Sequence, residues 1–162
     1  MTINNDPYEM ALAVADTTPD AGDTILNCLD RAVEAGDQRA KFARACCFVD
    51  GKYGSLIENK AANALFLQLE DSDIAEALFA AAYCYDVGDG VIENKLRAFS
   101  LYLKAAILGH KDANWQVSEF FREDVTVPHE EGLVEFFKAR SELEERLISP
   151  PQRLQLRPIP AQ

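Results

Sequence analysis

A four-residue stretch that occurs twice in the chain restricts its fold more than any other feature. Ile57-Glu58-Asn59-Lys60 recurs unchanged 35 residues later as Ile92-Glu93-Asn94-Lys95. Upstream positions also correspond, at a shift of 37 residues: Ala40 with Ala77, Phe48 with Tyr85, and Gly51 with Gly88. The difference of two residues predicts an insertion in the first turn, within residues 52–56.

A third copy begins at Ala113, 36 residues after Ala77. It continues through Val117, Ser118 and Phe121, which match Ala81, Ala82 and Tyr85. A period near 36 residues with a glycine-bearing turn is typical of stacked helical hairpins. One hairpin cannot hide its apolar stripe from water, whereas stacked hairpins bury the stripes of their neighbours. The sequence therefore predicts an all-α repeat architecture.

The apolar periodicity predicts helices over residues 6–16, 23–35, 38–50, 60–71, 74–87, 95–108, 111–122 and 131–147. We expect the last helix to bury one apolar face, formed by Leu133, Phe136, Phe137, Leu143 and Leu147. The four prolines after Ser149 exclude a helix there. We therefore predict one domain over residues 1–147, followed by a proline-rich extended or disordered tail over 148–162.

The clearest copy, from Ala77 to Ala113, resembles the Sel-1-like repeat, a relative of the tetratricopeptide repeat. The resemblance lies in the following positions: Tyr85, the turn Gly88-Asp89-Gly90-Val91, Asn94, Arg97-Ala98, Leu101-Tyr102, Ala105-Ala106 and Gly109. It implies a short right-handed α-solenoid of about three hairpins with capping helices. The other copies depart from the pattern, with Arg44 at an apolar position and Glu70-Asp71 where two alanines are expected. Degraded copies at both ends are typical of capping repeats.

The turn glycines and Asn94 have structural explanations in this framework. Gly88 and Gly90 supply the positive φ angles that a tight turn between helices demands. A phosphate-binding loop is disfavoured, because no strand precedes the turn and no Lys-Ser/Thr pair follows it. We expect Asn94 to cap the following helix.

The charge of the chain narrows the classes of partner. Lys and Arg number 16 against 27 Asp and Glu, for a formal net charge of −11. An acidic surface repels phosphate backbones and anionic lipids, so neither nucleic acid nor membrane is an expected partner.

The start of the chain shows no secretory signal, and no stretch approaches the length of a membrane span. The four cysteines lack CxxC spacing, which favours reduced thiols in a cytoplasmic protein.

No residue set predicts catalysis, a metal site or a cofactor. His110 and His129 each fall in a turn or loop without a second ligand at a suitable spacing. Cys46 and Cys47 lie near Arg44, which would favour the thiolate form of an exposed cysteine. Packing within a helix is the preferred interpretation of both cysteines. An enzyme of the kind suggested for cysteine-rich relatives is a third, disfavoured function.

The predicted partner-binding surface is the face of each first helix that the repeat does not use for packing. In such solenoids, these helices line the concave side. The expected partner-binding residues are Phe42, Phe79, Tyr83, Asp86, Trp115 and Glu119. Phe42, Phe79 and Trp115 share one repeat position and form an aromatic ladder, which either anchors a partner or packs between helices.

The resemblance implies a non-enzymatic module that binds a partner polypeptide on its concave face. A narrower alternative is a bacterial immunity protein that neutralises a cognate toxin, for which a basic partner would suit the net charge of −11.

Overall fold

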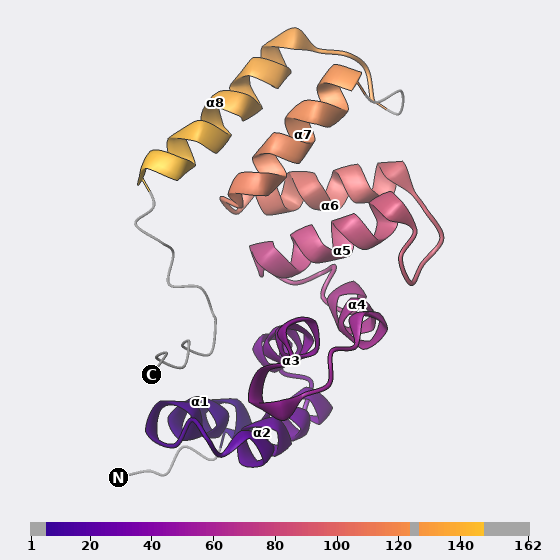
Figure 1. Ribbon diagram of the computed structural model, residues 1–162. Helices are drawn as coiled ribbons and strands as arrows, with labels where there is room; N and C mark the ends of the chain where they lie inside the picture. The colour runs from indigo at the N-terminus through magenta and orange to yellow at the C-terminus, as the bar shows by residue number, and fades with distance from the viewer. Residues whose placement is uncertain (1–5, 124–126, 148–162) are drawn as a thin grey trace. The chain divides into compact units, whose positions relative to one another are not determined.

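The computed structural model describes residues 6–123 and 127–147, and these residues form helices without strands (Figure 1). The helices are α1 (Pro7–Thr17), α2 (Gly22–Glu34), α3 (Gln38–Asp50), the 3-10 helix η1 (Lys52–Gly54), α4 (Asn59–Leu67), α5 (Ala75–Val87), α6 (Lys95–Ile107), α7 (Lys111–Glu123) and α8 (Glu131–Leu147). The all-α prediction is confirmed. The predicted boundaries agree to within one residue at every helix end except the end of α4.

The chain divides into two compact units between Leu65 and Phe66, within α4. We call them the N-terminal unit, with α1 to η1 and most of α4, and the C-terminal unit, with α5 to α8. The expected single domain over residues 1–147 stays a prediction. The expected tail over residues 148–162 lies outside the described residues.

The N-terminal unit has a small apolar core contributed by its first three helices. The buried residues of this core are Tyr8, Ala11, Ile25, Cys28, Leu29, Ala32, Ala40, Ala43 and Cys47. Most of them are small, so the helix backbones approach closely and little volume is left unfilled.

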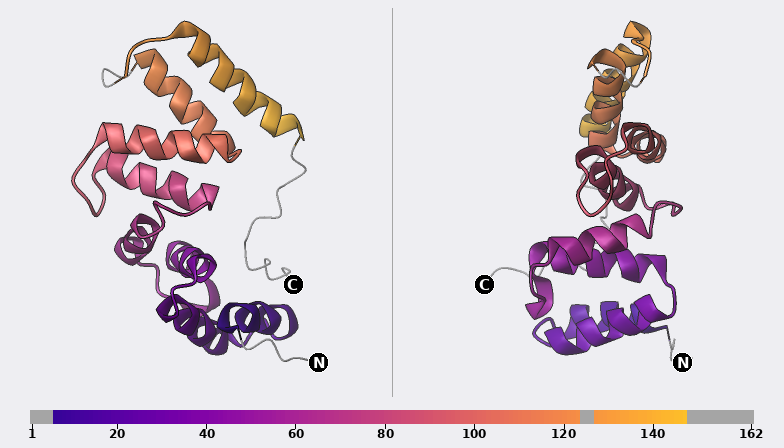
Figure 2. Two further views of the ribbon diagram at one scale, coloured as in Figure 1. Left: turned by 180° about the vertical axis from the view of Figure 1, so that it is seen from behind. Right: turned by 90° about the vertical axis from the view of Figure 1, so that its right-hand side faces the viewer.

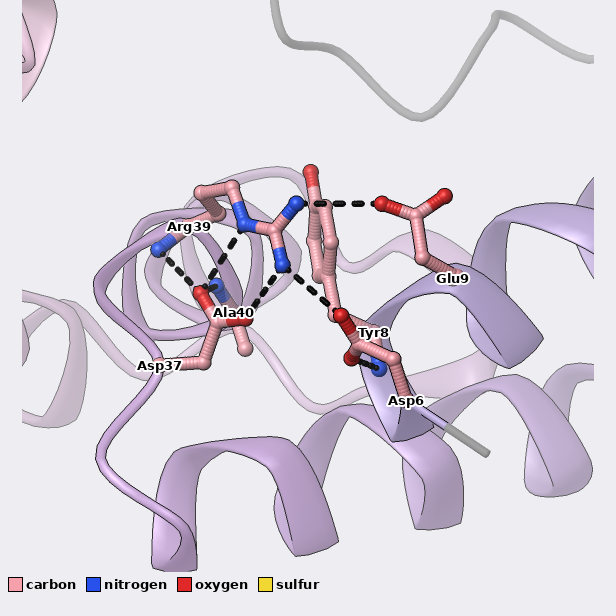
Figure 3. Close-up of polar contacts among 6 residues, drawn as sticks. All are labelled: Asp6, Tyr8, Glu9, Asp37, Arg39 and Ala40. Atoms are coloured by element: carbon pink, nitrogen blue, oxygen red, sulfur yellow. Dashed lines mark hydrogen bonds and ion pairs between the residues drawn. The ribbon is translucent and has the colours of Figure 1, made fainter. Parts of the chain in front are cut away.

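Arg39 joins two helix N-termini in this unit (Figure 3). Its guanidinium nitrogens lie 3.0 Å from a carboxylate oxygen of Asp6, 3.0 Å from Glu9 and 2.7 Å from Asp37. The guanidinium carbon also lies 4.5 Å from the ring centroid of Tyr8. Asp6 and Asp37 are themselves the N-caps of α1 and α3, so one side chain connects both capping carboxylates.

The hydrogen bond from Arg39 holds the pKa of Asp37 below its ordinary value. Burial raises the pKa of Tyr8, and the positive charge of Arg39 opposes that increase. These pKa shifts favour an ionised Asp37 and a neutral Tyr8 phenol at neutral pH.

The C-terminal unit contains two helical hairpins, α5–α6 and α7–α8, whose paired helices run side by side in opposite directions (Figure 2). The core lies between these helices. Its fully buried members include Leu78, Ala81, Ala82, Ala98, Leu101, Tyr102, Ala105, Ala106, Ala113 and Val117. The positions that the repeat pattern assigned to packing in the clearest copy are thus buried, Tyr85 being partly so.

Both repeat turns use glycine as predicted. Gly51 ends α3 at a φ of 66°, and Gly88 ends α5 at a φ of 74°. The insertion expected within residues 52–56 is seen as η1, where Tyr53 has a φ of 56°. Asn94 caps α6, since its side-chain oxygen accepts a 2.9 Å hydrogen bond from the Arg97 amide.

Two expectations about helices were wrong in detail. α4 ends at Leu67 instead of residue 71, and the turn that follows places Glu70 3.0 Å from Arg97 in an ion pair. This pair gives Glu70 a structural role at one of the two alanine positions of the pattern.

The apolar face predicted for α8 is the second error. Phe137 is buried, but Leu133, Phe136 and Leu143 are exposed, and the side chain of residue 147 lies outside the described set. The helix is rotated so that the buried face includes Val134 and Ser141. A buried hydroxyl requires a hydrogen-bond partner, and the Ser141 hydroxyl has one, since it donates a 3.2 Å hydrogen bond to the Lys111 carbonyl.

Candidate functional site

Two large aromatic side chains are exposed on the face predicted to bind a partner. Tyr83 of α5 is 51% exposed and Trp115 of α7 is 50% exposed. Tyr83 lies one helical turn before Asp86, and Trp115 lies one turn before Glu119, so each aromatic shares a face with a carboxylate.

The carboxylates of Asp86 and Glu119 line one open hollow of about 240 Å³ in the C-terminal unit. The lining residues come from α5, α6 and α7 and are Asp86, Lys95, Gln116, Glu119, Phe120 and Glu123. Asp86 and Glu119 are 33 positions apart in the sequence, and the fold brings them to the same opening.

Asp86 is held by two side chains of α6. Lys95 Nζ donates to Asp86 Oδ1 at 2.7 Å and to the Asp86 carbonyl at 2.9 Å. The buried Tyr102 hydroxyl donates to Asp86 Oδ2 at 3.4 Å. Burial raises the pKa of Tyr102, and the negative charge of Asp86 adds to the increase. Tyr102 therefore stays a neutral donor that fixes the orientation of the carboxylate.

The other carboxylates of the hollow share one cation. Arg122 pairs with Glu119, and its Nε lies 3.2 Å from a carboxylate oxygen of Glu123. The hollow thus has the carboxylates of Asp86, Glu119 and Glu123 and two paired cations, Lys95 and Arg122. The hollow retains a net negative charge while its carboxylates are oriented by neighbours.

Lys95, Gln116, Phe120 and Glu123 were absent from the predicted residues. A helical-face argument identifies some of them, because Gln116 and Glu123 lie three residues before and four residues after Glu119. Lys95 carried the stronger signal, since it closes the repeated tetrapeptide. Its contact with Asp86 depends on the turn between α5 and α6, which periodicity does not define.

The aromatic ladder divides into packed and exposed members. Phe42 of α3 is only 8% exposed. Phe79 of α5 is partly buried, stacks on His110 with ring centroids 4.4 Å apart, and contacts Tyr102 at 5.3 Å. Both side chains thus have the packing role that was the alternative interpretation. Trp115 is the ladder residue whose ring is half in water, and a partner-binding role for these residues stays a prediction.

The histidines have structural partners. His110 Nδ1 accepts a 3.2 Å hydrogen bond from the Ala113 amide, at the start of α7. His129 Nδ1 lies 3.0 Å from the Phe121 carbonyl oxygen. Each ring thus contacts the backbone of an adjacent helix end.

Arg44 does not activate the Cys47 thiol. Burial raises the pKa of the Cys47 thiol to about 11, although the charge of Arg44 opposes the shift. Arg44 Nε lies 2.7 Å from Asp30, and its guanidinium carbon lies 4.0 Å from the Phe48 ring centroid. Burial likewise raises the pKa of Cys84 to about 11.

Over residues 6–123 and 127–147, no group of three His, Cys, Asp or Glu side chains is arranged to hold a metal ion. Within the same part of the chain, no helix has the length and apolar character needed to cross a bilayer.

No protein-family model and no curated protein matches the sequence. Two solved structures are similar in fold. One is a protective antigen present in uropathogenic Escherichia coli strains that displays an SLR fold, with a TM-score of 0.71 and 15% identity over 85% of this chain and 30% of that chain. The other is a Sel1 repeat protein from Oxalobacter formigenes, with a TM-score of 0.70 and 16% identity over 88% of this chain and 59% of that one.

These likenesses define the fold. Helical hairpins that repeat with glycine turns make this chain an α-helical repeat protein. Its fold is the Sel1-like repeat fold, as the resemblance in the sequence predicted. The chain spans less than two thirds of the length of either structure that it matches.

Proposed function

We propose that this protein is a non-enzymatic interaction module that binds a segment of another polypeptide on the face formed by α5 and α7. Sel1-like repeat folds generally serve protein–protein interaction, but a fold by itself does not define function. The proposal therefore rests on the surface around Tyr83 and Trp115.

The exposure of these two aromatic rings is the observation that supports binding. Each leaves about half of a large, rigid side chain in water, where it adds nothing to the core. Tyr and Trp dominate binding hot spots because they bury much apolar area at small entropic cost. The neighbouring carboxylates of Asp86 and Glu119 supply a polar edge that fixes the register of a bound segment.

Trp115→Ala and Tyr83→Ala test the proposal. Partners are first identified by affinity purification with mass spectrometry, and the Kd of a purified partner is then measured by calorimetry. Truncation of a hot-spot aromatic costs about 2 kcal/mol or more, so we expect Kd to weaken at least about 30-fold. Phe136→Ala, an equally exposed aromatic on α8, is the matched control and should keep wild-type affinity. Wild-type binding by a folded Trp115→Ala and Tyr83→Ala double variant contradicts the proposal.

A second candidate is an inhibitor that neutralises a basic toxin, and the net charge of −11 is what favours it. Electrostatic steering accelerates the capture of an oppositely charged protein and weakens with salt. Co-expression of this protein with a toxin encoded beside its gene should protect cells from that toxin. The rate at which the purified protein associates with the toxin should fall as ionic strength rises. Absence of protection together with a salt-independent rate removes this candidate.

We place this function in the cytoplasm. The four cysteines are thiols in the structure, which suits a reducing compartment. Fractionation of cells that express the full chain tests the location, and recovery from an extracellular fraction contradicts it.

A further inference from the structure

The side of α8 that faces away from α7 carries a stripe of four apolar residues. α7 packs against the other side of α8 (Figure 1), where Val134, Phe137 and Ser141 are buried. Phe137 stacks on Phe121 of α7 with ring centroids 6.1 Å apart. At about 100° per residue, the opposite side of the helix bears exposed residues only. We call them the α8 stripe: Gly132, Phe136, Ala139 and Leu143.

The two large side chains of the α8 stripe are half in water. Phe136 is 55% exposed and Leu143 is 53% exposed. The ring of Phe136 meets the buried ring of Phe137 edge-on, with centroids 5.1 Å apart, so its orientation is supported by the core. Exposed apolar side chains that gather on one helix face mark an interaction surface.

The spacing of the α8 stripe is that of a helix that pairs with a second helix. Its residues follow one another at intervals of four, three and four, as the apolar positions of a coiled coil do. Large side chains alternate with Gly132 and Ala139, where two helix backbones can approach closely. The seam over residues 132–143 is about 17 Å long, which suits a weak and reversible contact.

The charges beside the α8 stripe complement those of a second copy. Glu135 borders the stripe on one edge and Arg140 borders it on the other. When two copies of α8 lie parallel, the Glu135 edge of each meets the Arg140 edge of the other, so the pair forms twice. Charged pairs at these positions set the partner and the orientation of coiled-coil helices. An antiparallel arrangement would instead bring Glu135 beside Glu142 of the second copy.

The present contacts of these two residues allow such a pair. The Glu135 side chain is 67% exposed and lies 3.6 Å from Lys138, a surface contact of little energy. Arg140 is partly exposed and donates a 3.3 Å hydrogen bond to the Ile107 carbonyl at the end of α6. A guanidinium has several N–H donors in a rigid fork, so it can hold that carbonyl and a carboxylate together.

We propose that the α8 stripe is a self-association surface, on which a second copy of this chain packs with the two α8 helices parallel. Phe136 and Leu143 of each copy meet their counterparts, and Glu135 of each copy pairs with Arg140 of the other. A symmetric contact of this kind closes at the dimer. It uses none of the partner-binding residues of α5 and α7, so the proposal is independent of the proposed function.

Sedimentation equilibrium of the full chain measures the dimer, with a reductant present because the chain has four cysteines. We expect the apparent mass to rise with concentration from the 18.0 kDa of one chain toward twice that value. Phe136→Ser/Leu143→Ser should weaken the Kd of the dimer at least about 100-fold, because each change occurs in both copies. Ile92→Ser/Leu96→Ser, at exposed apolar positions of the α5–α6 hairpin, is the matched control and should keep the wild-type Kd.

Two outcomes of this measurement overturn the proposal. One is a wild type that stays monomeric up to about 1 mM. The other is a Phe136→Ser/Leu143→Ser variant that is folded by circular dichroism and dimerises like the wild type.

Charge variants test the parallel arrangement and leave the apolar stripe intact. Glu135→Arg and Arg140→Glu should each weaken the dimer about tenfold, because like charges then face each other twice. An equimolar mixture of the two variants should form a mixed dimer, since every facing pair is then of opposite sign. Native mass spectrometry separates the mixed dimer from the two homodimers by mass. No preference for the mixed dimer, or a Glu135→Arg variant that dimerises more tightly than the wild type, contradicts the parallel arrangement and overturns the proposal.

Discussion

Replacement of Arg39 with methionine tests whether one side chain holds the N-terminal unit together. The substitution keeps much of the aliphatic stem but removes the guanidinium that lies within 3.0 Å of Asp6, Glu9 and Asp37. It also removes the cation from the face of Tyr8. The two helix caps remain, because the Asp6 and Asp37 side chains accept from the backbone of their own helices.

The size of the loss follows from the exposure of the cluster. The Arg39 side chain is 41% exposed, so each ion pair is screened by water and contributes about 0.2–1 kcal/mol. The contact with Tyr8 adds about 0.5–1 kcal/mol. We expect Arg39→Met to lower the free energy of unfolding by about 2 kcal/mol and Tm by about 4–8 °C. Arg39→Lys keeps the charge but cannot reach several oxygens at once, so its loss should be intermediate.

The difference between wild type and Arg39→Met should depend on pH. The pKa of Asp37 is lowered in the folded protein. Its contribution is therefore complete above the ordinary aspartate pKa of about 3.9 and is lost as the pH falls through the folded value. Between pH 7 and pH 2.5 the gap in stability should shrink, and added salt at pH 7 should shrink it as well.

Urea unfolding followed by circular dichroism at several pH values measures these quantities. Arg31→Met is the matched control, because Arg31 is an exposed residue of α2 outside the cluster. A loss below about 0.5 kcal/mol for Arg39→Met, equal to that of the control, refutes the reasoning. A gap that is constant from pH 7 to pH 2.5 shows that the carboxylates are not its source.

Two further predictions concern close packing. In Gly22→Ala, an added Cβ would lie 2.4 Å from the Tyr53 carbonyl oxygen, so the backbone of η1 must shift; we expect a loss of about 1–3 kcal/mol by thermal unfolding, and a wild-type Tm contradicts the contact. Cys47 and Cys84 have thiol pKa values raised to about 11, so at pH 7.5 both should react with iodoacetamide far more slowly in the folded protein than in urea. Mass spectrometry locates the label, and equal rates in both states contradict their burial.

Local interactions made much of the fold predictable. The Gly88 turn and the Asn94 cap follow from backbone sterics and from hydrogen bonds within a few residues. Helix ends were predictable for the same reason. The end of α4 was not, and the turn beyond it carries Glu70, whose ion pair with Arg97 joins residues 27 positions apart in the sequence.

The candidate site was predictable only in part. Periodicity placed Tyr83 with Asp86 and Trp115 with Glu119 on one helix face each, and their role in binding stays a prediction. It did not show that Asp86 and Glu119 share a hollow with Lys95, since that depends on how α5, α6 and α7 pack.

The repeat in the sequence by itself determined the helical hairpins and their turns, because these depend on apolar spacing and on glycine at fixed positions. The Sel1-like repeat fold was implied by the resemblance of the clearest copy. Phe79 and Trp115 occupy equivalent positions of the repeat, and tertiary structure decided which of the two aromatic side chains is exposed to water. Phe79 is covered by His110 and Tyr102, whereas Trp115 at the equivalent position keeps half of its surface exposed. A helical period assigns a side chain to a face of its own helix. Whether that face is covered depends on neighbours that pack against it from distant parts of the chain.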